Sequence, residues 1–490
     1  MRLIYLGGAS LAVLAASPVL AAPAARPVSN AAVLARLSAL EARLDALQAE
    51  NADLHHQLDD QKATVATIPA QVSTAVAEAA PKTPLPAPKP AAQTAVNWTV
   101  VPQFVSPDGN FTFKPRGTIQ FDYANFHERK GGYDYNDGTQ IRRGRFGFDG
   151  TAFRQFAYRI EGEYVGGTVA LLDAYVAYTG VKNFTFTVGQ LKVPAGLEAN
   201  SPDAFNEFME RGMANTAFGQ VGGERRVGLT FAYANPVITA TAGLYGAGEA
   251  VSRNTTTPGE VWGYNGRVTI EPINRPGRLL HVGASAYHVT DLAANSVTLA
   301  DRPNVRVDNG NIESVTITGT NPANGPQTGV KGATFYGLEG AGVFGPFAVQ
   351  AEYSHMNLDR FGASPSLNFD GYYVFGSFFL TGESRSFKGG AIDRLRPIHA
   401  FDPAKGNWGA FELAARYDRL NLTDHNLSSA NHDAHAFTAA LNWYLTSNVK
   451  LLFNYIRFEG QNSPLVAAPV SINGTTAKGD AFATRLNIDF

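Results

Sequence analysis

The chain has 490 residues, a formal net charge of −2, 11% aromatic residues and no cysteine. The near-zero net charge excludes a protein that binds nucleic acid through bulk positive charge. Without cysteine the fold is held together without disulfides, and the length allows one large domain or two to three ordinary ones.

The first 21 residues have the composition of a secretory signal peptide. Arg2 precedes an apolar stretch from Leu3 to Ala16, and a proline and a small-residue site follow it. We expect cleavage after Ala21. The alternative is an uncleaved anchor, but the apolar stretch is shorter than the roughly 20 residues that span a bilayer as a helix. No later apolar run is long enough to span as a helix, so this exported chain would enter a membrane only as strands.

Residues 30–68 have the apolar spacing of a coiled coil, with steps that alternate between four and three residues. The core positions are Val33, Leu37, Leu40, Leu44, Leu47, Asn51, Leu54, Leu58, Gln61, Val65 and Ile68. A buried amide such as that of Asn51 would fix the register, and Arg36 and Glu41 occupy positions where they would pair between parallel chains. A single helix lying on a barrel or the cell wall is the alternative. Leucine at both kinds of core position does not decide between a dimer and a trimer.

Residues 69–96 are rich in proline and alanine, a composition typical of a stiff, extended linker. From about residue 110 onward the composition changes again, and the rest of the chain has a different periodicity.

Residues 110–490 contain about sixteen segments in which apolar and polar residues alternate, as in "GTIQFDYANF" and "RFGFDGTAF". The connections between these segments mostly alternate between tight turns, such as "RQ", "NP", "GP" and "SN", and long loops. Short turns at one end and long loops at the other are typical of an outer-membrane barrel. We therefore predict an all-β, sixteen-stranded antiparallel transmembrane β-barrel, and keep a soluble sandwich or propeller as the alternative.

The last segment, "FATRLNIDF", alternates to the final residue. Phe482 and Phe490 lie on the apolar face, which would contact lipid, and Arg485 lies on the other. Because a barrel closes only when its last strand pairs with its first, we interpret this segment as the closing strand.

The inner face of each predicted strand follows from the position of its apolar residues. Inward-facing carboxylates include Glu161 and Glu163. Seven arginines are predicted to line the lumen: Arg143, Arg145, Arg159, Arg226, Arg267, Arg416 and Arg485. Guanidinium groups stay charged and fit oxyanions, so a chain of them would bind and relay anions. The alternative is a structural network in which they pair with the inward carboxylates.

The gap from Lys192 to Gly223 contains "SPDAFNEFMERG", in which Ser201 and Pro202 resemble the start of a short helix. The candidate constriction residues in it are Glu207, Glu210 and Arg211. Such a loop would fold into the lumen and narrow it, or alternatively would cap the barrel from outside.

Catalytic, cofactor and metal sites find little support in the sequence. "GAGVFG" at 340–345 runs into a hairpin turn instead of a helix, so we do not interpret it as a dinucleotide site. His425, His432 and His435 share a polar loop, and a solvated loop explains them better than a metal does. We predict that the protein is not an enzyme and needs no cofactor.

Segments along residues 110–490 resemble the phosphate-selective porin O/P family. They include "IRRGRFGFDGTAF", "FMERG", "GYYVFGSFFLTGESRSF" and "LNWYLTSNVKLLFNYIRF". The resemblance implies a homotrimer of barrels in the Gram-negative outer membrane, an arginine-lined lumen for anions and an inward loop. It assigns Arg143 and Arg145 to the basic second strand and Arg211 to the loop motif. In that family, phosphate selectivity also depends on lysines at the constriction. We find no equivalent cluster in this sequence, since Lys192 and Lys331 are isolated in it.

Our leading hypothesis is therefore passive diffusion of small anions, phosphate or related oxyanions among them, through an outer-membrane homotrimer surrounded by lipid. The alternative is a general or other-solute porin whose periplasmic coiled coil tethers the outer membrane to peptidoglycan.

Overall fold

The computed structural model describes two compact units, residues 1–91 and 92–490. In the first it describes residues 38, 42–46, 48–53, 55–60 and 62–63; in the second it describes 94–98, 101–131, 133–219, 221, 224–246, 261–290, 292, 295–320, 325–464 and 476–490. The predicted signal peptide and residues 69–93 of the predicted linker lie outside the described residues. The linker's last residues, 95 and 96, begin a strand instead.

The described residues of the first unit are helical, as the heptad spacing predicts. Two predicted core residues, Leu44 and Leu58, are 59% and 51% exposed on this single chain. In the part of the chain that the structure describes, none of the helices combines the length and the apolar character needed to cross a membrane.

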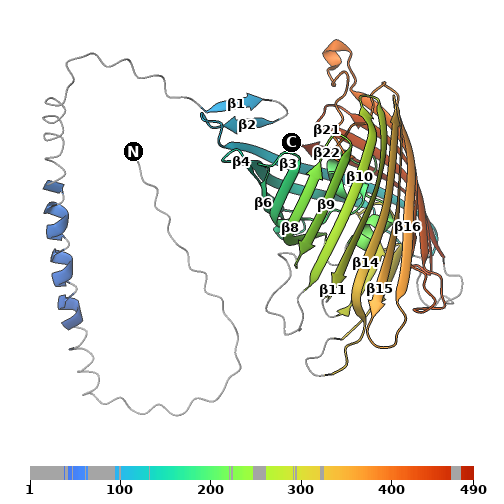
Figure 1. The fold of residues 1–490 in the computed structure, drawn as a ribbon, viewed down its shortest axis with the longest axis horizontal. Coiled ribbons are helices and arrows are strands. Elements are labelled where there is room, and N and C mark those ends of the chain that lie inside the picture. The colour runs from blue at the N-terminus through green and yellow to red at the C-terminus, as the bar shows by residue number, and fades with distance from the viewer. Residues whose placement is uncertain are drawn as a thin grey trace. The chain divides into compact units, whose positions relative to one another are not determined.

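The second unit is a closed antiparallel barrel of sixteen strands (Figure 1). In chain order they are β3 (Thr112–Lys130), β4 (Gly138–Ala152), β5 (Phe156–Glu163), β6 (Ala170–Tyr178), β7 (Phe184–Lys192), β8 (Arg225–Ala234), β9 (Ile238–Tyr245), β10 (Trp262–Arg275), β11 (Arg278–Thr290), β14 (Val330–Phe344), β15 (Phe347–Arg360), β16 (Leu367–Phe379), β19 (Ala410–Asn421), β20 (Asp433–Tyr444), β21 (Val449–Gln461) and β22 (Thr476–Asp489). Each pairs with the next, and β22 pairs with β3 to close the ring. The predicted architecture and strand number are confirmed.

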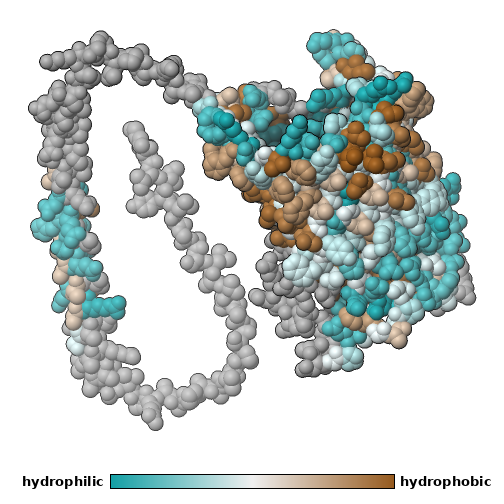
Figure 2. All heavy atoms as spheres, viewed as in Figure 1, coloured by the Kyte–Doolittle hydropathy of each residue, from teal (hydrophilic) through white to brown (hydrophobic). Residues whose placement is uncertain are grey.

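Residues alternate between the two faces of the wall as predicted. On β22, Phe482 is 48% exposed on the outer face, whereas Ala483 and Arg485 are buried on the inner face. Figure 2 shows apolar residues gathered on the outer face of the barrel toward the end that carries the short turns, and polar residues covering much of the other end. This outer surface matches a wall that contacts lipid on its apolar part.

One β-bulge changes the alternation at the start of β4. Gln120 pairs with Arg143 and Phe121 pairs with Ile141, so Arg142 is the extra residue between them. Bulges redirect side chains at barrel rims. As a result the side chains of Arg142 and Arg143 both point into the barrel, where they pair with Glu210 and Asp203. Simple alternation would place only one of the two arginines inside.

The remaining elements are short. β1 (Ala95–Trp98) and β2 (Pro102–Val105) form a hairpin that pairs with β3. β12 (Val297–Asp301) and β13 (Glu313–Ile317) form a hairpin in the loop between β11 and β14. β17 (Phe387–Lys388), β18 (Ala391–Ile392) and the 3-10 turn η3 (Pro403–Lys405) lie in the long connection between β16 and β19. The gap between β7 and β8 contains α2 (Leu197–Asn200), the 3-10 turn η1 (Asp203–Phe205) and α3 (Met213–Gly219).

Candidate functional site

The loop between β7 and β8 packs inside the barrel. Phe208 and Met209 are 1% and 2% exposed, and the Phe208 ring lies 5.4 Å from that of Phe375 on β16. The Arg416 guanidinium on β19 lies 4.6 Å from the same ring. Since β16 and β19 follow β7 and β8 by several strands around the wall, the loop extends across the lumen to reach them.

The segment around "SPDAFNEFMERG" is not the predicted helix. Only Asp203–Phe205 forms a 3-10 turn, without a side-chain cap. Ser201 closes the preceding helix α2 instead, because its hydroxyl donates to the carbonyl of Leu197 at 2.9 Å. The rest of the segment is irregular, and partners on the barrel wall satisfy its backbone.

Four wall side chains donate hydrogen bonds to the carbonyls of this irregular segment. Their partners are Lys450 to Asn206 at 2.7 Å, Asn442 to Glu207 at 2.9 Å, Arg485 to Met209, and Arg416 to Glu210 at 2.9 Å. A buried carbonyl without a partner costs free energy, so these donors stabilise the loop's path through the lumen.

Two wall carboxylates accept hydrogen bonds from backbone N–H groups at the starts of the loop's helices. Glu352 on β15 accepts those of Leu197 and Glu198 at 3.0 and 2.7 Å, at the start of α2. Asp418 on β19 accepts that of Met213 at 3.0 Å, at the start of α3. Because the first N–H groups of a helix lack intrahelical partners, these carboxylates attach both helices to the wall.

The loop leaves a cavity of about 530 Å³ beside β4 and β7–β11. Among the described residues, eight basic side chains line it: Arg142, Arg143, Arg145, Lys192, Arg211, Arg226, Arg302 and Arg306. Three carboxylates also line it: Asp203, Glu210 and Glu224. Eight positive charges against three negative ones leave an excess of five among the lining side chains, before counting Glu163 and Asp301, which pair with Arg145 and Arg306 from outside the lining.

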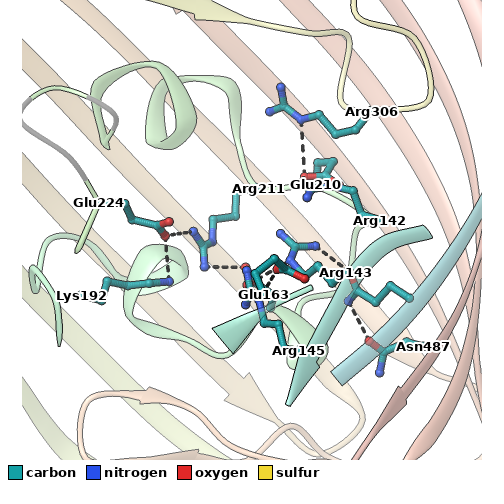
Figure 3. Close-up of polar contacts among 12 residues, drawn as sticks. Arg142, Arg143, Arg145, Glu163, Lys192, Glu210, Arg211, Glu224, Arg306 and Asn487 are labelled. Atoms are coloured by element: carbon teal, nitrogen blue, oxygen red, sulfur yellow. Dashed lines mark hydrogen bonds and ion pairs between the residues drawn. The ribbon is translucent and has the colours of Figure 1, made fainter. Parts of the chain in front are cut away.

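Six of the eight basic side chains share the three carboxylates (Figure 3), whereas Arg226 and Arg302 donate to backbone carbonyls. Asp203 lies 2.6 Å from Arg145, 2.5 Å from Arg211 and 3.3 Å from Arg143. Glu163 pairs with Arg145 as well, at 2.7 Å. Each of the three lining carboxylates is therefore held by more than one cation, so the lining carries more positive than negative charge.

Glu210 and Glu224 hold the cations at the two ends of this cluster. Arg142 lies 2.8 Å from Glu210, and Arg306 from the loop after β12 lies 3.6 Å from it. Glu224 lies 2.9 Å from Lys192 and 2.8 Å from Arg211. The sequence suggested that Lys192 is isolated, but the structure places it in the same cluster.

The loop carboxylates stay ionised in this setting. Burial alone would raise the pKa of Asp203, but the nearby Arg143, Arg211 and Arg145 outweigh it and hold the pKa well below the usual range. Arg142 and Arg485 do the same for the pKa of Glu210.

The seven predicted arginines all face inward, yet they do not form one continuous ladder. Arg143, Arg145 and Arg226 line the cavity. The other four are engaged elsewhere: Arg159 with Asp149, Arg267 with Glu339, Arg416 with the loop and Glu198, and Arg485 with Asp122 and Glu210. Pairing with carboxylates, the alternative interpretation, describes these four and also Arg145, which pairs with Glu163.

Sequence reasoning missed Arg142, Arg302 and Arg306. The bulge that turns Arg142 inward has no local sequence signal, and Arg302 and Arg306 lie in a loop whose path depends on tertiary contacts. The predicted constriction residues Glu207, Glu210 and Arg211 are brought together inside the lumen, where Glu207 pairs with Arg385. Among the described residues, no group of three or more His, Cys, Asp or Glu has the geometry for a metal ion.

A family model described as phosphate-selective porin O and P matches residues 113–490. The chain belongs to this family. It is therefore an outer-membrane porin, a channel and not an enzyme. The porin is 30% identical over 437 residues to an uncharacterized protein of Caulobacter vibrioides, across 86% of this chain and 82% of that protein. It is 28% identical over 413 residues to Porin O of Pseudomonas aeruginosa, across 78% of this chain and 89% of the relative.

Solved structures of outer-membrane channels also align with the porin. The anion-selective porin from Comamonas acidovorans aligns over 78% of this chain and all of that chain, with 14% identity and a TM-score of 0.49. This likeness is too distant to carry an argument about the site.

Proposed function

We propose that this porin gives passive passage to small anions, phosphate and related oxyanions among them, along the side of the lumen that the loop leaves open. The observation that carries the proposal is the excess of positive charge among the side chains that line the cavity. A fixed charge in a narrow, partly desolvated passage acts on an ion more strongly than the same charge in bulk water. The loop between β7 and β8 is the proposed constriction, with Glu207, Glu210 and Arg211 in it.

The path of the loop supports this assignment. By packing against β15–β22 it covers Glu352 and Asp418, whose oxygens are used by the loop's backbone. The space that remains lies beside the basic strands. An anion entering it meets Arg145 and Arg211, whose guanidinium groups bind oxyanions through paired N–H donors.

Reversal potentials in planar bilayers, measured across a KCl gradient, test the proposal. We expect anions to be more permeant than cations. The double substitution Arg143→Gln and Arg145→Gln should lower this preference, whereas Arg457→Gln, at a side chain that is 57% exposed and does not line the cavity, should leave it unchanged. Cation preference in the unmodified porin would overturn the proposal.

We also propose that the porin is a homotrimer whose N-terminal helices associate as a coiled coil in the periplasm and contact peptidoglycan. The supporting observation is the exposure of Leu44 and Leu58 on the single helix, since apolar core positions of this kind are normally buried by a partner helix. Deletion of residues 30–68 tests it. Loss of the trimer would assign the helix to assembly. A loosened envelope with intact trimers would assign it to tethering. If the deletion changes neither the trimer nor the envelope, both roles are refuted.

A further inference from the structure

One part of the cavity wall is aromatic instead of charged. Tyr245 on β9, Tyr287 on β11 and Phe335 on β14 line it and are 1%, 7% and 4% exposed. The rings of Tyr287 and Phe335 are stacked, with centroids 4.9 Å apart and planes at 12°. Val289 on β11 also lines this part. Five of the eight basic side chains come from β4, β7 and the loop, and Arg226 on β8 lies where the charged part adjoins Tyr245 and Tyr287.

The hydroxyl groups of the two tyrosines have partners within the protein. The Tyr287 hydroxyl donates to the carbonyl of Phe218 at 2.6 Å, and the Tyr245 hydroxyl lies 3.2 Å from that of Thr230. With their hydroxyls engaged, these side chains offer mainly apolar contact. A hydrated inorganic anion gains nothing from such contact, whereas an organic body buried against it is removed from water.

The size of the cavity fits an organic solute. Small-molecule sites in proteins have volumes of roughly 300–1,000 Å³, and this cavity has about 530 Å³. A water molecule occupies about 30 Å³ in the liquid. A tetrahedral oxyanion would therefore leave most of the space to water.

We propose that this site takes organic anions, with an oxyanionic head group on the basic cluster and an aromatic or aliphatic body against Tyr245, Tyr287 and Phe335. This inference rests on the proposed anion passage and names the class of solute. The head group binds to Arg145, Arg211 and Lys192, the cations that already share Asp203 and Glu224. The body contacts the stacked rings of β11 and β14.

A matched pair of probes tests the proposal on the full-length porin. Phenylphosphonate and methylphosphonate carry the same head group and differ in the apolar body. Each is added to planar bilayers in KCl, and the concentration that halves the chloride current is measured. Because burial of a ring against an apolar wall strengthens binding, we expect phenylphosphonate to block at a roughly tenfold lower concentration.

Two neighbouring side chains on β14 provide the variant and its control. Phe335 faces the cavity, and Tyr336 is 54% exposed on the outer face. Phe335→Ala should bring the ratio of the two blocking concentrations close to one, and Tyr336→Ala should leave it unchanged.

The comparison of probes on the unmodified porin decides the question without any variant. Equal block by the two phosphonates, in a porin that prefers anions in KCl, would overturn the solute class and leave the anion function intact. An absence of anion preference would overturn both. A larger block by phenylphosphonate that survives in Phe335→Ala would place the apolar contact elsewhere and refute the assigned wall.

Discussion

Phe490, the last residue, exchanges two backbone hydrogen bonds of 2.9 Å with Gly117 on the first barrel strand. The Phe490 ring lies over that glycine, so a Cβ on residue 117 would be 2.5 Å from the ring. The ring also lies 6.3 Å from that of Phe146 on β4. The C-terminal residue therefore completes the closure of the barrel at both its backbone and its side chain.

Gly117→Ala should impair this closure. The added methyl group pushes the Phe490 ring away from β3, and a clash of this kind costs about 1–3 kcal/mol when neighbours cannot adjust. Because the clash is with the far end of a side chain that can rotate, we expect the low end of that range. The fraction of barrel that keeps its folded mobility on unheated detergent gels measures the loss. Gly266→Ala is the control, since its nearest such neighbour is 4.0 Å away; equal losses in both variants would contradict the role of the ring.

The barrel could be predicted from the sequence because its constraints are local and repeated. Each strand needs an outer face that lipid accepts, so apolar residues recur at every second position and expose the register. The alternation at Phe482 and Arg485 was sufficient to assign both faces of β22. The bulge beside Gln120 broke the rule at one point, and Arg142 was therefore not among the residues predicted to face inward.

Glu352→Gln and Asp418→Asn should loosen the loop in the lumen. Each carboxyl group accepts hydrogen bonds from backbone N–H groups at the start of a helix, and a hydrogen bond contributes about 0.5–1.5 kcal/mol. The oxygen of a side-chain amide can still accept one of these hydrogen bonds. Its NH₂ group, however, is itself a donor and cannot accept a hydrogen bond from a second backbone N–H group. We expect larger single-channel conductance with more frequent current fluctuations.

Asp480→Asn is the control for these loop variants, because Asp480 pairs with Arg129 on β3, at 2.8 Å. The heat stability of the folded barrel is measured alongside. If conductance stays constant while heat stability falls, the two carboxylates stabilise the barrel and do not position the loop.

The interior of the site was harder to predict than the barrel, for a physical reason. The loop's conformation is set by residues far along the chain, such as Asp418, which holds Met213. Local cues suggested that Ser201 and Pro202 begin a helix, but tertiary partners determined the outcome. Whether an inward arginine is paired likewise depends on strands that are distant in sequence.

Anion preference should rise as the pH falls from about 7.5 to 5. Burial raises the pKa of Asp301 in the loop after β12 to about 6, against the opposing effects of Arg306 and of the Arg302 N–H. Arg142 and Glu210 are the other charged groups nearby. Protonation of Asp301 removes a negative charge next to Arg306, whereas Glu210, whose pKa is lowered, stays ionised.

The same shift has a defined effect on stability. The folded protein binds the Asp301 proton more tightly than the unfolded chain does, so this group favours folding at low pH and its contribution declines between the usual pKa of 3.8 and about 6.

Asp301→Asn should give a flat, high anion preference, and Asp308→Asn on the same loop, where the pKa is lowered, should keep the pH dependence. A pH dependence that persists in Asp301→Asn would assign it to another group.

Leu44→Asp combined with Leu58→Asp should disrupt association of the N-terminal helices. Both positions are core positions of the heptad pattern, and an Asp there would place a charge in each helix contact, where its desolvation is unfavourable. The matched control places the same residue at Ala49 and His56, which are exposed on the same helix and lie outside the core positions. Chemical cross-linking of the porin in detergent, followed by gel analysis, measures the association. If the helix assembles the trimer, the core variant should lose cross-linked trimer and the control should retain it; equal cross-linking in both would show that the barrels associate without the helix.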